Sequence, residues 1–170
     1  MMLAIATTIV VFAIMIAEMQ VSRRNERVLR SRGAIEPHDD VYKTMTWAYP
    51  VSFVAMGIEG LIRGGADPRL VIVGIVVFGI AKALKFWAIH SLGTYWSFRV
   101  LVVPNHRLVA DGPYRFVRHP NYVAVAGEML GVALLLGAFV SGALATAGFV
   151  WLMRRRIAIE ERALGLTASR

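Results

Sequence analysis

The chain reads GPYRFVRHPNYVAVAGEMLGVALLLGAF from Gly112 to Phe139, a polar and aromatic loop that runs directly into an apolar stretch. The loop, as far as Tyr122, holds two arginines, a histidine, two tyrosines, two prolines and a glycine. Such a cluster at a membrane boundary costs free energy unless it binds something. We therefore expect a polar ligand to bind where the apolar stretch begins.

The composition around this stretch indicates an integral membrane protein. Of the 170 residues 57% are hydrophobic, and the mean hydropathy is +0.59. A soluble domain of this length usually has more charge and less apolar sequence. The net charge is +8, but the basic residues lie beside apolar runs, so we expect membrane lipids as partners and no nucleic acid. The absence of cysteine excludes disulfides, thiolate zinc sites and cysteine nucleophiles.

Five apolar runs predict an all-α integral membrane fold with about five transmembrane helices, since a span needs roughly 20 apolar residues. We expect these spans at residues 2–19, 41–62, 70–89, 122–139 and 141–153. The last two are separated by a very short link and should form a tight hairpin. We divide the chain into residues 1–90, with three spans and a basic loop, and residues 91–170, with the binding core.

The arginines predict the orientation of these helices. Fourteen of them follow the first, third and fifth predicted spans, whereas only Arg63 and Arg69 lie on the opposite side. The positive-inside rule then places the N-terminus outside and the C-terminus in the cytoplasm, as in a bacterial inner (plasma) membrane. The N-terminal span lacks the features of a cleaved signal peptide. Residues 91–120 and the C-terminal tail share the cytoplasmic face, where their polar motifs can meet.

The His119-Pro120 pair opens the fourth predicted span. Proline suits the first turn of a helix, and the free backbone donors of that turn can hold an anionic group such as a carboxylate. His119 can donate to the same group, Arg118 adds charge, and Tyr122 lies one turn further on the same side. The alternative is an interfacial belt in which these side chains only anchor the helix.

Glu160 and Glu161 follow an arginine triplet on the expected extension of the last span. Adjacent side chains point about 100° apart on a helix, so the two carboxylates cannot face one ligand in the same way. One can accept hydrogen bonds from ribose hydroxyls or an ammonium group while the other pairs with Arg156 or Arg162. The alternative is a solvated, charge-paired helix end.

Glu128 lies inside the fourth predicted span, where a carboxylate is costly and indicates function. It can act as a general base, or it can form a structural ion pair with Lys82 or Lys85. Both lysines are expected to extend to the cytoplasmic surface. Glu59, near the end of the second span, is expected to be interfacial.

The motifs of the long loop and of the last helix, taken in their order along the chain, resemble those of the isoprenylcysteine carboxyl methyltransferase family of integral membrane methyltransferases. They lie in LGTYWSFRVLVVPNHRLVADGPYRFVRHPNY and, after the hydrophobic hairpin, in RIAIEERAL. The specific elements are Gly112-Pro113-Tyr114, Arg118-His119-Pro120-x-Tyr122 and Glu160-Glu161-x-x-Leu164. The resemblance covers about residues 91–164.

The resemblance implies S-adenosyl-L-methionine as cofactor, in a pocket that faces the cytoplasm. His119 and Tyr122 would hold its methionine end, residues 108–114 would line the adenosine part, and the last helix would contribute a glutamate. The implied cofactor-binding residues are Leu108, Val109, Gly112, Tyr114, His119, Pro120, Tyr122, Glu160 and Glu161. A lipophilic acceptor would reach the pocket from the bilayer. No metal is required, and a homo-oligomer is compatible with the sequence.

The segments Asn25-Glu26-Arg27 and Arg32-Gly33-Ala34-Ile35-Glu36 resemble the short bacterial branch associated with type III polyketide synthases. This implies O-methylation of an alkylpyrone or alkylresorcinol lipid by a single in-line displacement. Glu128 and His119 are the candidate bases, although His119 cannot easily serve both the cofactor and as base, and Arg118 or Arg115 could steady the acceptor anion. The alternatives are a prenylcysteine carboxyl methyltransferase, a phospholipid amine methyltransferase, a membrane reductase with a nicotinamide cofactor, and a lipid-binding protein.

Overall fold

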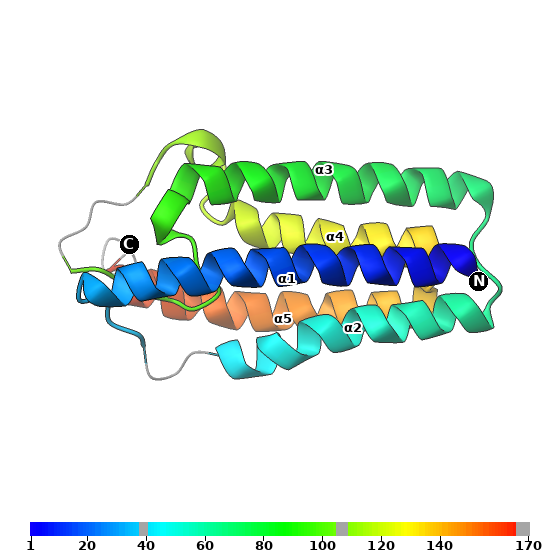
Figure 1. The fold of residues 1–170 in the computed structure, drawn as a ribbon, viewed down its shortest axis with the longest axis horizontal. Helices are drawn as coiled ribbons and strands as arrows, with labels where there is room; N and C mark the ends of the chain where they lie inside the picture. Colours follow the sequence, from blue (N-terminus) through cyan, green and yellow to red (C-terminus); the bar gives the residue numbers. More distant parts are fainter. Residues whose placement is uncertain (38–40, 105–108, 166–170) are drawn as a thin grey trace.

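The computed structural model describes residues 1–37, 41–104 and 109–165. Five long helices run lengthwise through it (Figure 1): α1 (Met2–Ser31), α2 (Tyr42–Ile62), α3 (Pro68–Leu92), α4 (Pro120–Leu136) and α5 (Phe139–Ala163). Two short 3-10 helices, η1 (Gly93–Tyr95) and η2 (Gly112–Arg115), lie in the long connection between α3 and α4. An isolated antiparallel bridge pairs Ile35 with Val102. The prediction of an all-α fold is confirmed for the described residues.

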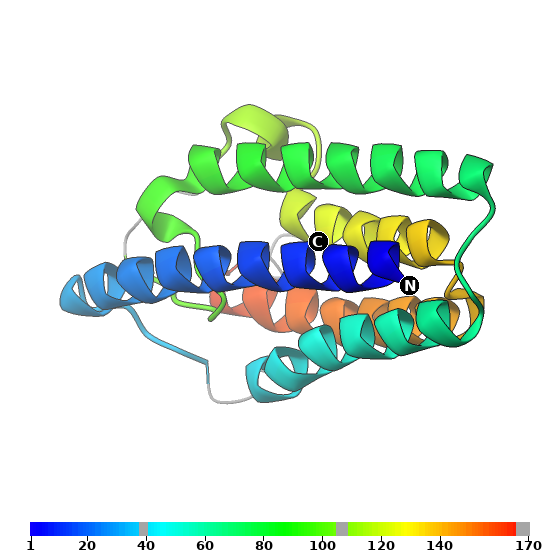
Figure 2. The same cartoon turned by 45° about the vertical axis from the view of Figure 1, so that its right-hand side comes forward.

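Helix α4 lies between α3 and α5 in both views of the bundle (Figures 1 and 2), and most of its residues are buried. It packs most extensively along α3. Glycines permit this close approach, because a Cβ on Gly74 would lie 2.5 Å from the backbone nitrogen of Leu135. A Cβ on Gly131 would likewise lie 2.7 Å from the backbone nitrogen of Phe78. These contacts hold the C-terminal half of α4 closely against α3.

Three helical segments of the described chain are long and apolar enough to cross a membrane: Met2–Ser31, Tyr42–Ile62 and Pro68–Tyr95. Their surfaces expose large apolar side chains that a bilayer would cover. Helix α4 is apolar but has 17 residues, and α5 carries arginines and glutamates in its second half. Three of the five predicted spans therefore meet the length and hydropathy that a span requires.

The predicted hairpin between the last two helices is confirmed. Gly137 ends α4 with a φ of +66°, a left-handed conformation that favours glycine, and the N–H of Ala138 donates to the carbonyl of Ala133 at 2.9 Å. Helix α5 begins at the next residue, Phe139. The two helices therefore reverse direction within two residues.

Glu59 of α2 caps the N-terminus of α5, so the purely interfacial role expected for it is wrong. Its carboxylate accepts hydrogen bonds from the backbone N–H groups of Val140 (3.1 Å) and Ser141 (2.7 Å) and from the Ser141 hydroxyl (2.6 Å). The first N–H groups of a helix have no partner within the helix, and a negative charge beside them is favourable. This contact fixes α2 to the hairpin.

We expect the Glu59→Ala variant to lower the thermal unfolding midpoint of the detergent-purified protein by a few degrees, because the first turn of α5 loses its cap. Circular dichroism at increasing temperature measures this directly. The exposed Arg24→Ala variant on α1 is the control and should melt like the wild type. An unchanged midpoint for Glu59→Ala would show that the cap contributes nothing to stability.

Candidate functional site

The connections from α1 to α2 and from α3 to α4 lie at the same end of the bundle (Figure 1). A cavity of about 710 Å³ lies at this end, where α3 ends and α4 begins. It is lined by the end of α3, residues 95–104, the first turn of α4 and the last turns of α5. Small-molecule sites typically enclose roughly 300–1,000 Å³, so its size suits an organic cofactor. Its polar lining includes His119, Asn121, Tyr122, Arg156 and Glu160.

His119 and Tyr122 face this cavity from the start of α4. Pro120 is the first residue of the helix and is buried, so it fixes the direction in which the helix leaves the loop. The ring centroids of His119 and Tyr122 lie 5.5 Å apart, and both side chains line the cavity. The spacing of one helical turn therefore brings both residues to the same cavity, as expected.

The two predicted polar motifs meet at this cavity. The Tyr122 hydroxyl donates to Glu160 Oε2 at 2.8 Å, and His119 Nε2 lies 3.3 Å from Glu161 Oε1. Arg118 Nη1 lies 3.8 Å from the same Glu161 oxygen. The adjacent carboxylates of Glu160 and Glu161 therefore contact different side chains, as expected from helix geometry. Glu160 lines the cavity, whereas Glu161 is outside the lining and pairs with Arg118 and His119 rather than with the arginines of its own helix.

Arg156 lines the cavity, whereas the sequence indicated it only as part of a basic triplet and as a possible partner of one of the two glutamates. It is 6% exposed, and its Nε donates to the Tyr122 hydroxyl at 3.0 Å while a terminal nitrogen donates to the carbonyl of Phe98. Tyr122 thus accepts a hydrogen bond from Arg156 and donates one to Glu160. The spacing of four residues from Arg156 to Glu160 places both on one helix face, and this signal was available in the sequence.

The segment before α4 reaches the cavity through Val109 and Tyr114. Burial raises the pKa of the Tyr114 phenol, and the negative charge of Glu160 raises it further, so this hydroxyl stays protonated. Leu108, predicted to line the adenosine part, lies outside the described residues. Gly112 does not line the cavity and instead packs on α3.

Gly112 has a φ of +60°, and a Cβ there would lie 2.0 Å from Ser91 Oγ. We expect Gly112→Ala to displace η2 from α3 and to cost about 1–3 kcal/mol of stability. The matched control is Gly33→Ala, at a φ of +78° with nothing within 4 Å of its added Cβ. Chemical denaturation of both variants measures the difference. If both variants lose the same free energy of unfolding, the close approach to Ser91 adds nothing to the cost of placing alanine at a positive φ.

Glu128 lies in a buried cluster of charges rather than in the cavity lining. Its carboxylate pairs with Lys82 (3.0 Å) and Lys85 (3.4 Å) and accepts a hydrogen bond from the Tyr49 hydroxyl. Glu18 of α1 pairs with the same two lysines at 2.9 and 2.6 Å. Of the two roles expected for Glu128, these contacts therefore support the structural ion pair with Lys82 and Lys85 rather than the general base.

The expectation that the two lysines extend to the membrane surface is wrong. Lys85 is 2% exposed, and its ammonium group lies between Glu18 and Glu128. Two lysines and two glutamates balance their charges, which makes their burial tolerable. Side chains of α1, α3 and α4, with Tyr49 from α2, meet in this cluster, so it ties four helices together.

The fold defines a helical membrane protein with a cavity at one end of its bundle. A model of the isoprenylcysteine carboxyl methyltransferase (ICMT) family matches residues 72–165, and the chain belongs to this family of membrane methyltransferases. The matched region contains α4, α5, nearly all of α3 and the long connection that contributes to the cavity.

Relatives in bacteria match over most of their length. The chain is 36% identical to the uncharacterized protein YpbQ of Bacillus subtilis over 87% of this chain and 88% of that one. It is 24% identical to an uncharacterized protein of Haemophilus influenzae over 91% and 90%. The protein-S-isoprenylcysteine O-methyltransferase of Schizosaccharomyces pombe is 44% identical over 57 residues, 34% of this chain and 24% of the yeast protein.

Proposed function

We propose that this protein transfers a methyl group from S-adenosyl-L-methionine to an oxygen of a lipophilic acceptor at the membrane. The observation that carries the proposal is the meeting of His119 and Tyr122 from α4 with Glu160 from α5 at one cavity, in a member of the ICMT family. The enzyme class is then an S-adenosylmethionine-dependent O-methyltransferase.

The chemistry of the lining fits this cofactor. S-Adenosyl-L-methionine presents a carboxylate, an ammonium group, ribose hydroxyls and an adenine ring. His119 and Asn121 can donate to the carboxylate, and Glu160 can accept from the ammonium group or the ribose hydroxyls. The apolar lining, which includes Val100, Val102 and Leu164, can cover the adenine ring.

The bound cofactor supplies an electrophilic methyl group on a sulfonium centre. The residues of the chain contribute mainly position, because holding two reactants in line lowers the barrier without any further covalent step. Arg118 lies at the edge of the cavity with a guanidinium that can stabilise an acceptor oxygen anion, and we propose this role for it. Glu128 is held by two lysines outside the cavity lining, so we assign no proton transfer to it.

We propose that all five long helices cross or enter a bacterial inner membrane, with the N-terminus outside and the C-terminus in the cytoplasm. The arginines gathered at one end of the bundle support this orientation. The cavity lies at that same end and would face the cytoplasm, where the cofactor is available. A lipophilic acceptor would reach it from the bilayer.

For the acceptor we propose an alkylpyrone or alkylresorcinol lipid. The support is the resemblance of residues 25–27 and 32–36 to the bacterial branch associated with polyketide synthases, together with two bacterial relatives that match along most of the chain. A prenylcysteine carboxylate is the second candidate, favoured by the 57-residue match to the yeast enzyme. Either acceptor presents an oxygen nucleophile beside a long apolar chain.

The cofactor class is tested by calorimetric titration of detergent-purified protein with S-adenosylmethionine, S-adenosylhomocysteine and NADPH. We expect saturable binding of the two adenosyl compounds and no binding of NADPH. Binding of NADPH alone would favour a membrane reductase and would overturn the proposal. The titration is repeated with added lipid, so that a requirement for lipid is not mistaken for a lack of binding.

A further inference from the structure

The last turns of α1 hold one wall of the cavity, although they lie outside residues 72–165 that the family model matches. This wall is the segment 96–103, of which every residue except Phe98 lines the cavity. Two buried polar side chains of α1 contact its backbone: Ser22, which is fully buried, and Asn25, which is 7% exposed. Neither side chain lines the cavity itself.

Asn25 and Ser22 use their hydrogen-bonding groups on this wall. The Asn25 Nδ2 amide donates to the carbonyls of Gly93 (3.1 Å) and Trp96 (2.8 Å), so both of its hydrogens are engaged. The Ser22 hydroxyl accepts from the backbone N–H of Phe98 at 2.8 Å and donates to Glu26 at 2.7 Å. Within residues 93–98 these bonds satisfy two backbone carbonyls and one backbone N–H, so they help to determine where this backbone lies.

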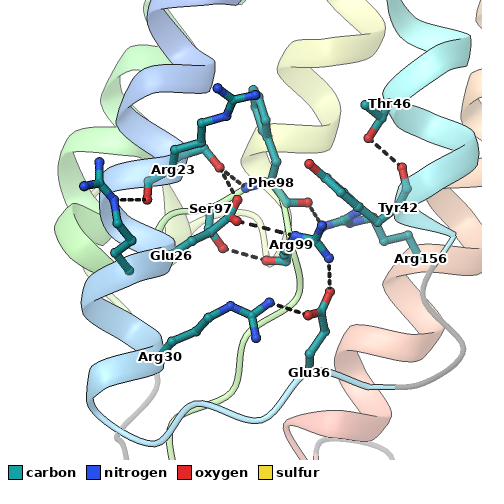
Figure 3. Close-up of polar contacts among 12 residues, drawn as sticks. Arg23, Glu26, Arg30, Glu36, Tyr42, Thr46, Ser97, Phe98, Arg99 and Arg156 are labelled. Atoms are coloured by element: carbon teal, nitrogen blue, oxygen red, sulfur yellow. Dashed lines mark hydrogen bonds and ion pairs between the residues drawn. The ribbon is translucent and has the colours of Figure 1, made fainter.

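Ion pairs also link this segment to α1 and to the residues that follow α1 (Figure 3). Arg99 contacts Glu36 at 2.6 Å and Glu26 at 3.4 Å, and Arg30 contacts Glu36 at 2.5 Å. Burial raises the pKa of the Glu36 carboxyl, but hydrogen bonds from Arg99 and Arg30 more than offset this and hold it below its ordinary value. Glu36 is therefore ionised at neutral pH. These contacts join the wall to the chain that follows α1.

From this wall a chain of hydrogen bonds runs into the cavity. The carbonyl of Phe98 accepts from Arg156, Arg156 donates to the Tyr122 hydroxyl at 3.0 Å, and Tyr122 donates to Glu160 at 2.8 Å. Figure 3 shows Arg156 directed at the wall beside Phe98. Because Arg156 contacts both the Phe98 carbonyl and the Tyr122 hydroxyl, a shift of the Phe98 backbone would displace the arginine that orients Tyr122.

We propose that Ser22 and Asn25 are positioning residues for cofactor binding. They act through the backbone of residues 93–98 and through Arg156 on Tyr122 and Glu160. This inference rests on the proposed function, because it concerns the same cavity. Glu18, one turn before Ser22, is anchored in the buried charge cluster, so the position of α1 along the bundle is fixed at the same point.

The test measures two quantities in full-length, detergent-purified protein carrying Ser22→Ala or Asn25→Asp. Hydrogen exchange of peptides within residues 93–103 reports on the wall, and calorimetric titration of S-adenosylhomocysteine reports on the site. We expect faster exchange in the wall, unchanged exchange in the middle of α4, and a roughly tenfold weaker affinity. Ser22→Ala removes one oxygen only and serves as the milder variant if Asn25→Asp does not fold.

Two controls separate positioning from general loss of stability. Arg24→Ala changes an exposed residue on the same helix and should leave both readouts unchanged. Glu59→Ala weakens the cap of α5, away from the cavity lining, and should lower the melting temperature while keeping wild-type affinity. A loss of affinity in Glu59→Ala equal to that in Ser22→Ala would overturn the inference.

The inference and the proposed function fail in different ways. Wild-type binding that both α1 variants retain in full, or unchanged exchange within residues 93–103, would overturn the inference and leave the proposed function standing. A folded wild-type protein that binds no adenosyl compound would overturn the proposed function, and with it the role of α1 in cofactor binding.

Discussion

We expect the His119→Ala variant to bind S-adenosylhomocysteine roughly 10- to 100-fold more weakly than the wild type, because hydrogen bonds to charged groups contribute more than neutral ones. The imidazole lines the cavity, packs against Tyr122 and contacts Glu161 at 3.3 Å. Its removal takes away a donor for the ligand and the imidazole contact of Glu161. Calorimetric titration of the purified variant measures the change.

His90→Ala is the matched control for this variant. His90 lies on the exposed side of α3, where its ring stacks on Phe86 at 6.4 Å, and it does not line the cavity. This variant should bind the ligand like the wild type. If His119→Ala keeps wild-type affinity, the ligand does not lie against the start of α4, and the proposed placement of the cofactor is wrong.

The second large effect is expected inside the bundle. Lys85→Met leaves Glu18 and Glu128 with one lysine between them, and removing one partner of a buried ion pair costs about 3–5 kcal/mol. We expect this variant to unfold at a much lower denaturant concentration than the wild type, or to be recovered in small amounts. Denaturation in mixed micelles measures the free energy of unfolding.

Charge balance, rather than any single contact, should control this stability. The double variant Lys85→Met, Glu128→Gln removes one charge of each sign, so its loss should be smaller than the sum of the two single losses. Strictly additive losses would contradict the view of the cluster as one balanced unit. If Glu128→Gln has wild-type stability and affinity but loses turnover, Glu128 is the general base that its position in the sequence first suggested.

Apolar runs and a few local signals predict the frame of this molecule. The hydrophobic stretches mark all five long helices, the short link at Gly137 predicts the hairpin, and the His119-Pro120 pair marks the beginning of α4. The prediction that loop and tail share one face also brings Tyr122 and Glu160 together correctly. These inferences succeed because each depends on residues close together in the sequence or on the end of the bundle at which a segment lies.

The residues that sequence reasoning missed act across helices. Glu59 caps a helix that begins 80 residues later, Arg156 binds the backbone of Phe98, and Asn25 binds carbonyls near Trp96. A periodic pattern reports which face of a helix is apolar, but not which backbone groups of another segment that face will meet. The prediction that Lys85 extends to the membrane surface was wrong for the same reason, since its two carboxylate partners lie on α1 and α4.

Methyl transfer itself tests the central claim most directly. Membranes containing the wild type or His119→Ala are incubated with S-adenosylmethionine labelled in its methyl group and with an alkylresorcinol, an alkylpyrone or a prenylcysteine. We predict that label enters an organic-soluble product only with the wild type. Label that resists mild alkali marks the aryl ether of an alkylresorcinol, whereas release as methanol marks a prenylcysteine ester. If folded wild-type protein that binds the cofactor transfers no label to any of these acceptors or to native membrane lipids, the assignment as a lipid O-methyltransferase is contradicted.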